Sequence, residues 1–354
     1  MKTGTAQLPL HYGKAPSWLF QRMTKLAREI TICIIDERGT DEMLQRLSDP
    51  FWFQAFGCVL GFDWHSSGLT TTVCGALKEG IKGIENELGF FIAGGKGSAS
   101  RKTPSEIERY CYALSMDPQN LVYASRMSAK VDSTALQDGY QLYHHTFCFT
   151  KEGTWSVIQQ GMNTDNHYAR RYHWISTAVD NFVCEPHQAI CCDARGKGLN
   201  MVAFESEHCR QISTALSKEK PDTLISEIEK VEKLILPQHH DIKPLDLDTS
   251  RLRKIMITTY ERQPNNYEAL LGMKGVGPKT IRALSLLSEL VYGAKPSFRD
   301  PARFSFSHGG KDGHPYPVDR DAYDFSIEFL KKCINNVKIS HREKKEAFKR
   351  LSRL

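Results

Sequence analysis

Leu271-Gly272-Met273-Lys274-Gly275-Val276-Gly277-Pro278-Lys279-Thr280-Ile281-Arg282-Ala283-Leu284 is the stretch that decides the fold of the C-terminal part of this chain. Gly275 and Gly277 can adopt positive φ, and without a Cβ atom they leave their backbone N–H groups uncovered. Pro278 suits the first position of a helix because its φ is already helical and it has no N–H group to lose. We therefore predict a glycine hairpin that leads directly into a helix.

Apolar residues on both sides of this hairpin recur at helical spacing. Those before it are Tyr267, Leu270 and Leu271, and those after it are Ile281, Leu284, Leu287 and Leu290. An uncapped helix start presents unpaired N–H groups and a partial positive charge of about half an elementary charge, which suits a phosphate oxygen. The sequence thus predicts helix, hairpin and helix, with a phosphate site at the hairpin.

This pattern resembles the helix-hairpin-helix family of DNA-binding elements, because the G-V-G-x-K-T core is present at residues 275–280. The resemblance implies that DNA is the partner. The residues expected to contact it are Lys274, Gly275, Val276, Gly277, Thr280 and Arg282. The structural alternative is a Gly-Pro turn between two packed helices.

The distribution of charge agrees with a nucleic-acid surface in this part of the chain. Residues 251–354 contain 21 Lys and Arg against 11 Asp and Glu, a net charge of +10, so the total of +6 leaves −4 for residues 1–250. Basic residues concentrated in one region are typical of proteins that bind nucleic acids. The alternative for the most C-terminal charges is a solvated helix face.

The 354 residues exceed the usual size of a single core and predict two domains. No pair of the 10 cysteines has C-x-x-C spacing, and no apolar run is long enough to cross a bilayer. We expect a reduced, soluble, cytoplasmic and nucleoid-associated protein that has no metal or cofactor and no membrane partner. The oligomeric state stays open.

Local patterns predict an α+β fold. A helix is expected over residues 17–30 after Pro16, a buried strand at 90–93, and a hairpin of strands 142–150 and 154–160. Thr103 and Glu106 have the spacing of a capping box. From residue 206 onward the pattern is nearly all helical, so we place a mixed α/β domain at 1–205 and a helical domain at 206–354.

The C-terminal part also resembles DNA glycosylases of the endonuclease III type, in which the hairpin precedes an apolar helix and a V-D aspartate, here Val318-Asp319. The resemblance implies that Lys279 is the catalytic lysine and Asp319 the catalytic aspartate. An amine can attack the sugar and cleave the backbone through a Schiff base, while a carboxylate stabilises the cationic sugar. This predicts a DNA-repair glycosylase with lyase activity.

Two departures leave other interpretations open. Lys279 and Asp319 are 40 positions apart, roughly twice the spacing expected for that family. The cysteines of an iron–sulfur cluster are absent, since only Cys333 follows residue 209. Lys279 can instead hold a phosphate or lie on a solvated helix surface, and Asp319 can cap a helix.

The N-terminal part contains further candidate residues. Asp63 and His65 could form an acid/base pair, and with Glu185 they could serve a nuclease for which the hairpin is only a DNA handle. The alternative for His65 is a structural histidine beside a turn. A third possibility for the whole chain is a DNA-binding adaptor without enzymatic activity.

Two basic segments of the N-terminal part could contact phosphate. The glycine-rich segment 94–97, which contains Lys96 and is followed by Arg101 and Lys102, could cradle phosphate or be an ordinary basic loop. Arg170, Arg171 and His173 alternate with aromatic residues, as in patches that stack bases, although such residues can equally belong to a core.

Over nearly its whole length the chain resembles the family called domain of unknown function 763. The segments that carry the resemblance are 3–6, 8–11, 61–68, 93–97, 100–104 and 170–174. This resemblance implies kinship but no settled activity.

Overall fold

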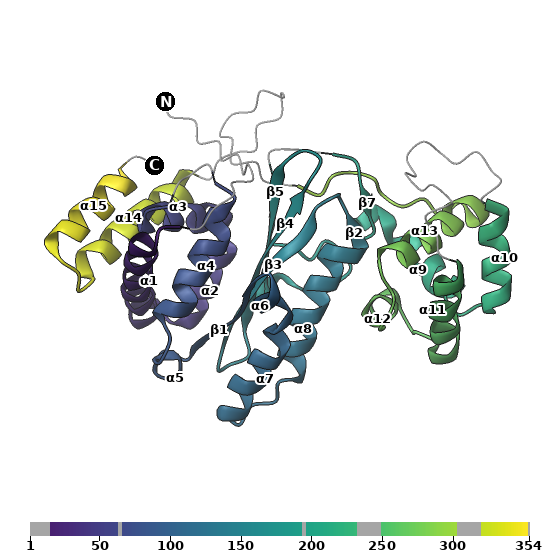
Figure 1. The fold of residues 1–354 in the computed structure, drawn as a ribbon, viewed down its shortest axis with the longest axis horizontal. Helices are drawn as coiled ribbons and strands as arrows, with labels where there is room; N and C mark the ends of the chain where they lie inside the picture. Colours follow the sequence, from purple (N-terminus) through teal and green to yellow (C-terminus); the bar gives the residue numbers. More distant parts are fainter. Residues whose placement is uncertain (1–14, 63–65, 193–195, 232–248, 303–319, 353–354) are drawn as a thin grey trace.

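A five-stranded antiparallel sheet forms the centre of the molecule (Figure 1). The computed structural model describes residues 15–62, 66–192, 196–231, 249–302 and 320–352. The strands lie in the order β1 (Phe90–Lys96), β3 (Gln141–Thr150), β4 (Trp155–Asn163), β5 (Tyr168–Ile175) and β6 (Ala189–Cys191). The predicted strand at 90–93 and the predicted hairpin at 142–160 are confirmed. A separate pair joins β2 (Leu136–Gln137) to β7 (Leu199–Asn200).

One face of the sheet is covered by helices from the N-terminal part of the chain. Phe90, Ile92 and Ile158 belong to the core on this face. The helices are α1 (Ser17–Arg38), α2 (Thr40–Ser48), α3 (Pro50–Leu60), α4 (Gly68–Gly80) and the short α5 (Glu85–Leu88). Helix α1 begins after Pro16 as predicted but continues beyond residue 30, because Thr31 and Ile34 extend its buried face.

The opposite face of the sheet packs against a second core that continues into the C-terminal helices. Phe91, Phe147 and Trp174 belong to it. Because both faces are buried, β1 is a continuous apolar run at residues 90–93. The covering elements are α6 (Ser98–Arg101), α7 (Thr103–Ala113), α8 (Gln119–Lys130) and the π-helical turn η1 (Val131–Ala135), followed later by the 3₁₀ turns η2 (Ser176–Ala178) and η3 (Phe204–Ser206).

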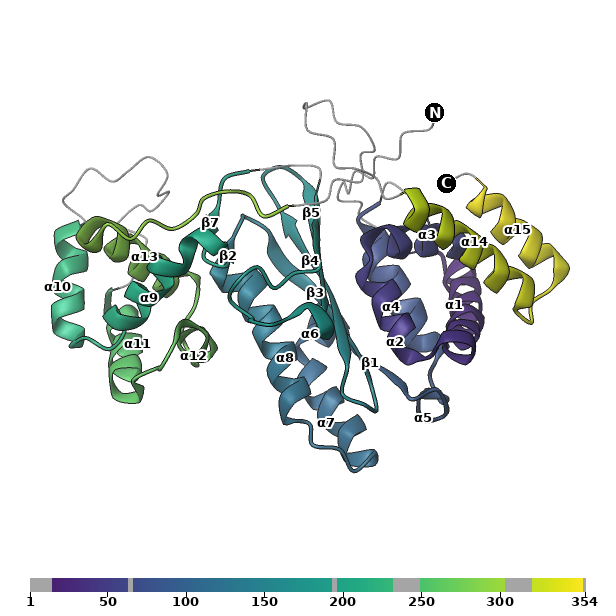
Figure 2. The same ribbon diagram turned by 180° about the vertical axis from the view of Figure 1, so that it is seen from behind.

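The C-terminal helices lie in two places. The helices α9 (Glu207–Leu216), α10 (Pro221–Val231), α11 (Thr249–Arg262), α12 (Tyr267–Gly272) and α13 (Pro278–Tyr292) form a group on one side of the sheet, whereas α14 (Arg320–Asn336) and α15 (His341–Leu351) lie on the other side, beside α1 and α3 (Figures 1 and 2). Arg350 Nη1 donates to the carbonyl of Val59 at 2.9 Å. The segment expected as one helical domain, 206–354, is therefore divided between the two sides of the sheet.

The fold is α+β, as the sequence predicts. Among the described residues, no helix is both long enough and apolar enough to span a bilayer. All ten cysteines are free thiols, and most of them are buried.

The predicted capping box at Thr103 and Glu106 is wrong. Thr103 is already helical, and its hydroxyl donates to the carbonyl of Ser100. Glu106 Oε2 instead accepts from Lys78 Nζ at 2.6 Å and from the N–H of Gly94 at 2.8 Å. The carboxylate thus joins α7 to β1 and α4, because a nearby ammonium and an unpaired amide compete successfully with the local helix start.

His144 on β3 is a buried histidine that is held neutral. The residue is 1% exposed, and its Nε2 atom lies 3.0 Å from the hydroxyl of Thr146. Burial, reinforced by His145 and Lys96, lowers the pKa of His144 from 6.5 to about 3. Between pH 6.5 and about pH 3, this histidine therefore binds a proton in the unfolded chain but not in the folded protein.

We predict that this histidine makes the protein less stable in acid. The contribution of neutral His144 to stability is complete above its pKa in the unfolded chain. As the pH falls from 6.5 toward 3 this contribution is lost, and the free energy of unfolding decreases by up to about 1.4 kcal/mol per pH unit. Urea unfolding at pH 6 and pH 4 measures the effect. Between these two conditions the free energy of unfolding should fall by about 2–3 kcal/mol less in His144→Gln than in the wild type. An equal loss in both proteins would contradict the assignment.

Candidate nucleic-acid interface

The hairpin between α12 and α13 adopts the predicted arrangement, with one difference in its glycines. Gly275 has φ +95°, in the left-handed region that favours glycine. Gly277 has φ −134° and is the extended N-cap of α13, so the positive φ considered for it is not used. No side chain caps this helix start, and among the described residues the N–H of Gly277 has no acceptor.

Buried side chains of the hairpin and of α13 anchor the hairpin in the protein core. Val276 and Thr280 are 1% and 2% exposed, and Ile281 and Leu284 are fully buried. The side chains of Val276 and Thr280, predicted as DNA contacts, are therefore turned into the protein, and only their backbone could serve a ligand. Anchoring of this kind keeps the flanking glycine backbone at the surface.

The positively charged side chains around the hairpin differ in their exposure to solvent. Lys274 and Lys279 are exposed. Arg282 is half-buried, and its Nε donates to Gln137 Oε1 at 2.8 Å, so this side chain already has a partner in the protein. The surface charge at the hairpin thus comes mainly from the two lysines.

Helix α11 borders the same surface, which the sequence did not reveal. A Cβ atom on Gly275 would lie 3.6 Å from Ile255 Cγ1, so α11 passes beside the turn. Arg251 is exposed and precedes Ile255 by four residues, so it lies on the same face of this helix. Its place in the basic segment 251–354 was the available signal. We define the hairpin surface as Lys274, Gly275, Gly277 and Lys279 together with Arg251.

The glycine-rich segment of the N-terminal part lies elsewhere, at the end of the edge strand β1. Lys96, Arg101 and Lys102 are exposed there, and the ammonium of Lys96 lies 5.8 Å from the ring centre of Tyr143. Gly94 has φ +87°, and a Cβ atom on it would lie 2.3 Å from the carbonyl oxygen of His145. Close packing against β3 therefore explains Gly94 without any ligand.

Arg170, Arg171 and His173 lie in the interior, which corrects their interpretation as a patch that stacks bases and contacts phosphate. All three side chains are 0% exposed. Arg171 Nη1 donates to Gln54 Oε1 at 3.0 Å, and His173 Nδ1 lies 3.0 Å from the carbonyl oxygen of Leu47. Burial lowers the pKa of His173, which favours the neutral ring. A surface for DNA requires exposed cations, and these residues provide none.

Arg170 forms two buried ion pairs that join distant parts of the chain. Its Nη1 and Nη2 atoms lie 2.8 Å from Asp138 Oδ2 and from Asp300 Oδ2 respectively. Its guanidinium also lies 4.4 Å from the ring centre of Tyr140. The arginine thereby connects β5 with the segment before β3 and with the segment after α13.

We predict that Arg170→Met destabilises the protein by about 3–5 kcal/mol, because it leaves two buried carboxylates without their cation. Urea unfolding at pH 7 measures the change. Lys102→Met, which removes an exposed cation, should change the stability by no more than about 0.5 kcal/mol. Equal stability of Arg170→Met and the wild type would refute the importance of these ion pairs.

Three predicted residues, Asp63, His65 and Asp319, lie outside the described residues. Glu185 is exposed on a loop and has φ +44°. Nearby in sequence, His187 Nε2 lies 2.5 Å from Asp132 Oδ1, and Trp174 Nε1 donates to Asp132 Oδ2 at 3.0 Å. The buried Asp132 carboxylate thus joins several parts of the core through hydrogen bonds. The sequence did not reveal this role, because the partners of Asp132 come from separate strands and loops.

Comparison with protein families identifies the chain. The model of the family described as "Protein of unknown function (DUF763)" matches residues 4–318. The chain belongs to this family. Neither the curated proteins nor the solved structures contain a match.

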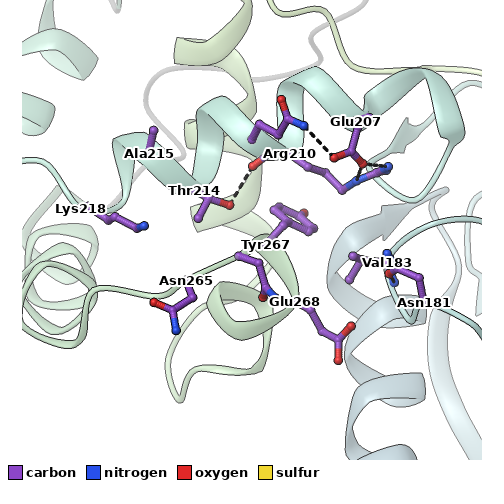
Figure 3. Close-up of a pocket in the computed structure, with 12 residues that line it drawn as sticks. Asn181, Val183, Glu207, Arg210, Thr214, Ala215, Lys218, Asn265, Tyr267 and Glu268 are labelled. Carbon is purple, nitrogen blue, oxygen red and sulfur yellow. Dashed lines mark hydrogen bonds and ion pairs between the residues drawn. The ribbon is translucent and has the colours of Figure 1, made fainter.

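This DUF763 protein also has a pocket of about 340 Å³ beside the start of α12. Figure 3 shows Tyr267 and Thr214 among the side chains that line it, from α12 and α9. Three of its charged groups are engaged within the protein: Glu207 binds Arg210 at 2.6 Å, and Glu268 accepts a hydrogen bond from Tyr123. Within the described part of the chain, no three His, Cys, Asp or Glu side chains are grouped so that they could hold a metal ion.

Proposed function

We propose that the protein binds the phosphate backbone of DNA through the hairpin surface. The observation that carries this proposal is the uncapped start of α13, where the N–H of Gly277 has no acceptor in the part of the chain that the structure describes, and Lys274 and Lys279 are exposed on either side. Helix starts of this kind favour anions through their N–H groups and their partial positive charge. Residues 251–302, which include α11 to α13, contain nine Lys and Arg against four Asp and Glu, and this net charge of +5 supports the same partner.

The composition of the surface indicates which part of DNA it contacts. Lysine side chains and backbone amides bind phosphate oxygens, and such contacts position a protein without reading base sequence. We therefore propose binding with little sequence preference and a strong dependence on salt, because each neutralised phosphate releases counterions.

We predict that replacing both exposed lysines weakens DNA binding. With a fluorescent 20-base-pair duplex, Lys274→Ala/Lys279→Ala should bind about 30-fold more weakly at low salt and should lower the salt slope by about 1.8, or about 0.9 for each lost phosphate contact. Lys345→Ala is the control, because this exposed lysine lies on α15, on the other side of the sheet. Wild-type binding that is absent or independent of salt would refute the proposal.

A second proposal concerns chemistry at the same surface. Lys279 is exposed in the first turn of α13, close to where the sugar of a nucleotide whose phosphate is held at the hairpin would lie. The amine would attack the C1′ aldehyde of an abasic site and expel water to form an imine. Loss of a C2′ proton would then eliminate the 3′ phosphate and cleave the strand. The resemblance to endonuclease III-type glycosylases supports this proposal, with Asp319 as the accompanying carboxylate.

Borohydride reduction tests the lyase directly. We predict a covalent adduct with DNA containing an abasic site, and its loss in Lys279→Ala. Lys274→Ala, which retains the proposed amine, should still form the adduct at saturating DNA. An adduct that survives Lys279→Ala excludes this amine, and DNA binding without any adduct and without cleavage of any DNA assigns the protein to the adaptors. Cleavage of intact DNA that requires metal and tolerates Lys279→Ala would favour the nuclease.

A further inference from the structure

The hairpin lies along α8 and the segment that follows it in the chain. At the start of α12, Tyr123 of α8 donates a hydrogen bond to Glu268. At its end, a Cβ atom on Gly272 would lie 3.5 Å from the sulfur of Met127. Figure 1 shows α12 beside α8, although the two are far apart in the sequence. The hairpin is therefore supported by the N-terminal half of the protein.

Two contacts of this support reach the hairpin backbone itself. Lys130 Nζ, at the end of α8, donates to the carbonyl of Val276. Gln137 Nε2, on β2, donates to the carbonyl of Pro278 at 3.0 Å. These two carbonyls belong to the peptide units whose N–H groups are those of Gly277 and Lys279.

Because each peptide unit is planar, a contact that holds its carbonyl also fixes the direction of its N–H group. In a trans peptide the C=O and N–H bonds point in opposite directions across a rigid plane. Holding the Val276 carbonyl toward Lys130 thus directs the N–H of Gly277 away from the protein body. The Gln137 contact acts in the same way on the N–H of Lys279.

The chemistry of the two side chains also suits this task. Among the described residues, the only hydrogen bond of the Lys130 side chain is to the Val276 carbonyl, and burial lowers the pKa of its amine. A cation on a carbonyl oxygen draws electron density from the peptide and makes its N–H a stronger donor. Gln137 is fixed at both ends, because its Oε1 accepts from Arg282 at 2.8 Å while its Nε2 donates to Pro278.

We propose that Lys130 and Gln137 are positioning residues for phosphate binding by the hairpin: they hold the carbonyls of Val276 and Pro278 so that the amides of Gly277 and Lys279 face the phosphate. The inference rests on the proposed DNA binding and adds that the binding element is completed by the N-terminal half of the chain. Lys130 acts through the peptide and makes no contact with DNA.

Salt dependence distinguishes this role from a direct phosphate contact. With the same fluorescent duplex, Lys130→Met should bind about tenfold more weakly while its salt slope stays at the wild-type value, whereas Lys274→Ala should lower the slope by about 0.9. Lys130→Arg should restore most of the affinity, because a guanidinium can also donate to the carbonyl. Gln137→Leu should weaken binding in the same way. Arg126→Met, which removes an exposed cation from the same helix, is the matched control.

A measurement without DNA separates the inference from the proposed function. In protein labelled with nitrogen-15 at glycine, Lys130→Met should shift the Gly277 amide resonance upfield and leave that of Gly153, in the turn between β3 and β4, unchanged. Urea unfolding of each variant shows whether it is folded.

Each result has one meaning. An unmoved Gly277 resonance, or unchanged affinity of Lys130→Met beside a wild type that binds DNA, overturns the inference alone. A lower salt slope in Lys130→Met also overturns it, because the lysine would then contact phosphate itself. A shifted Gly277 resonance in a protein that does not bind DNA overturns the proposed function, and with it the phosphate-binding role of the two residues.

Discussion

The two buried ion pairs of Arg170 are the interaction on which the arrangement of the chain depends. A guanidinium in the interior is tolerated only when carboxylates compensate for its lost hydration. The carboxylates come from Asp138, just before β3, and from Asp300, after α13. The requirement for both partners brings the segment after α13 to the sheet.

The central sheet places a second demand on the chain, because both of its faces are apolar and must be covered. Helices α1 to α4 cover one face, while α7 and α8 cover the other. The return of α14 and α15 to α1 and α3 extends the first layer with residues from the opposite end of the sequence. The second core continues into α9, α12 and α13, so the hairpin is built on the same apolar packing as the sheet.

This continuity gives the hairpin a fixed orientation. A short helix such as α12 has little stability of its own, since isolated helices of fewer than about 12 residues are marginal in water. Its contacts with α8 supply the missing stability, and buried Val276 holds the turn in place. The surface lysines and the glycine backbone are then presented by a rigid support, which lowers the entropic cost of binding a ligand.

The sequence alone determined the elements whose signals are local. Gly275 and Pro278 predict the hairpin and the start of α13, because a left-handed turn and a helical φ are properties of single residues. The start of α1 after Pro16 and the pairing of β3 with β4 have equally local causes, a proline-led apolar helix face and a short turn. The lysines of the hairpin surface were found for the same reason.

Only the tertiary structure decided which charged residues are available. Arg171 and Lys274 look alike in sequence, yet one is buried against Gln54 and the other is exposed. Lys130 reaches the hairpin across 146 positions of the chain. Burial and long-range pairing depend on which segments the packed cores bring together, and single-residue preferences contain no information about that.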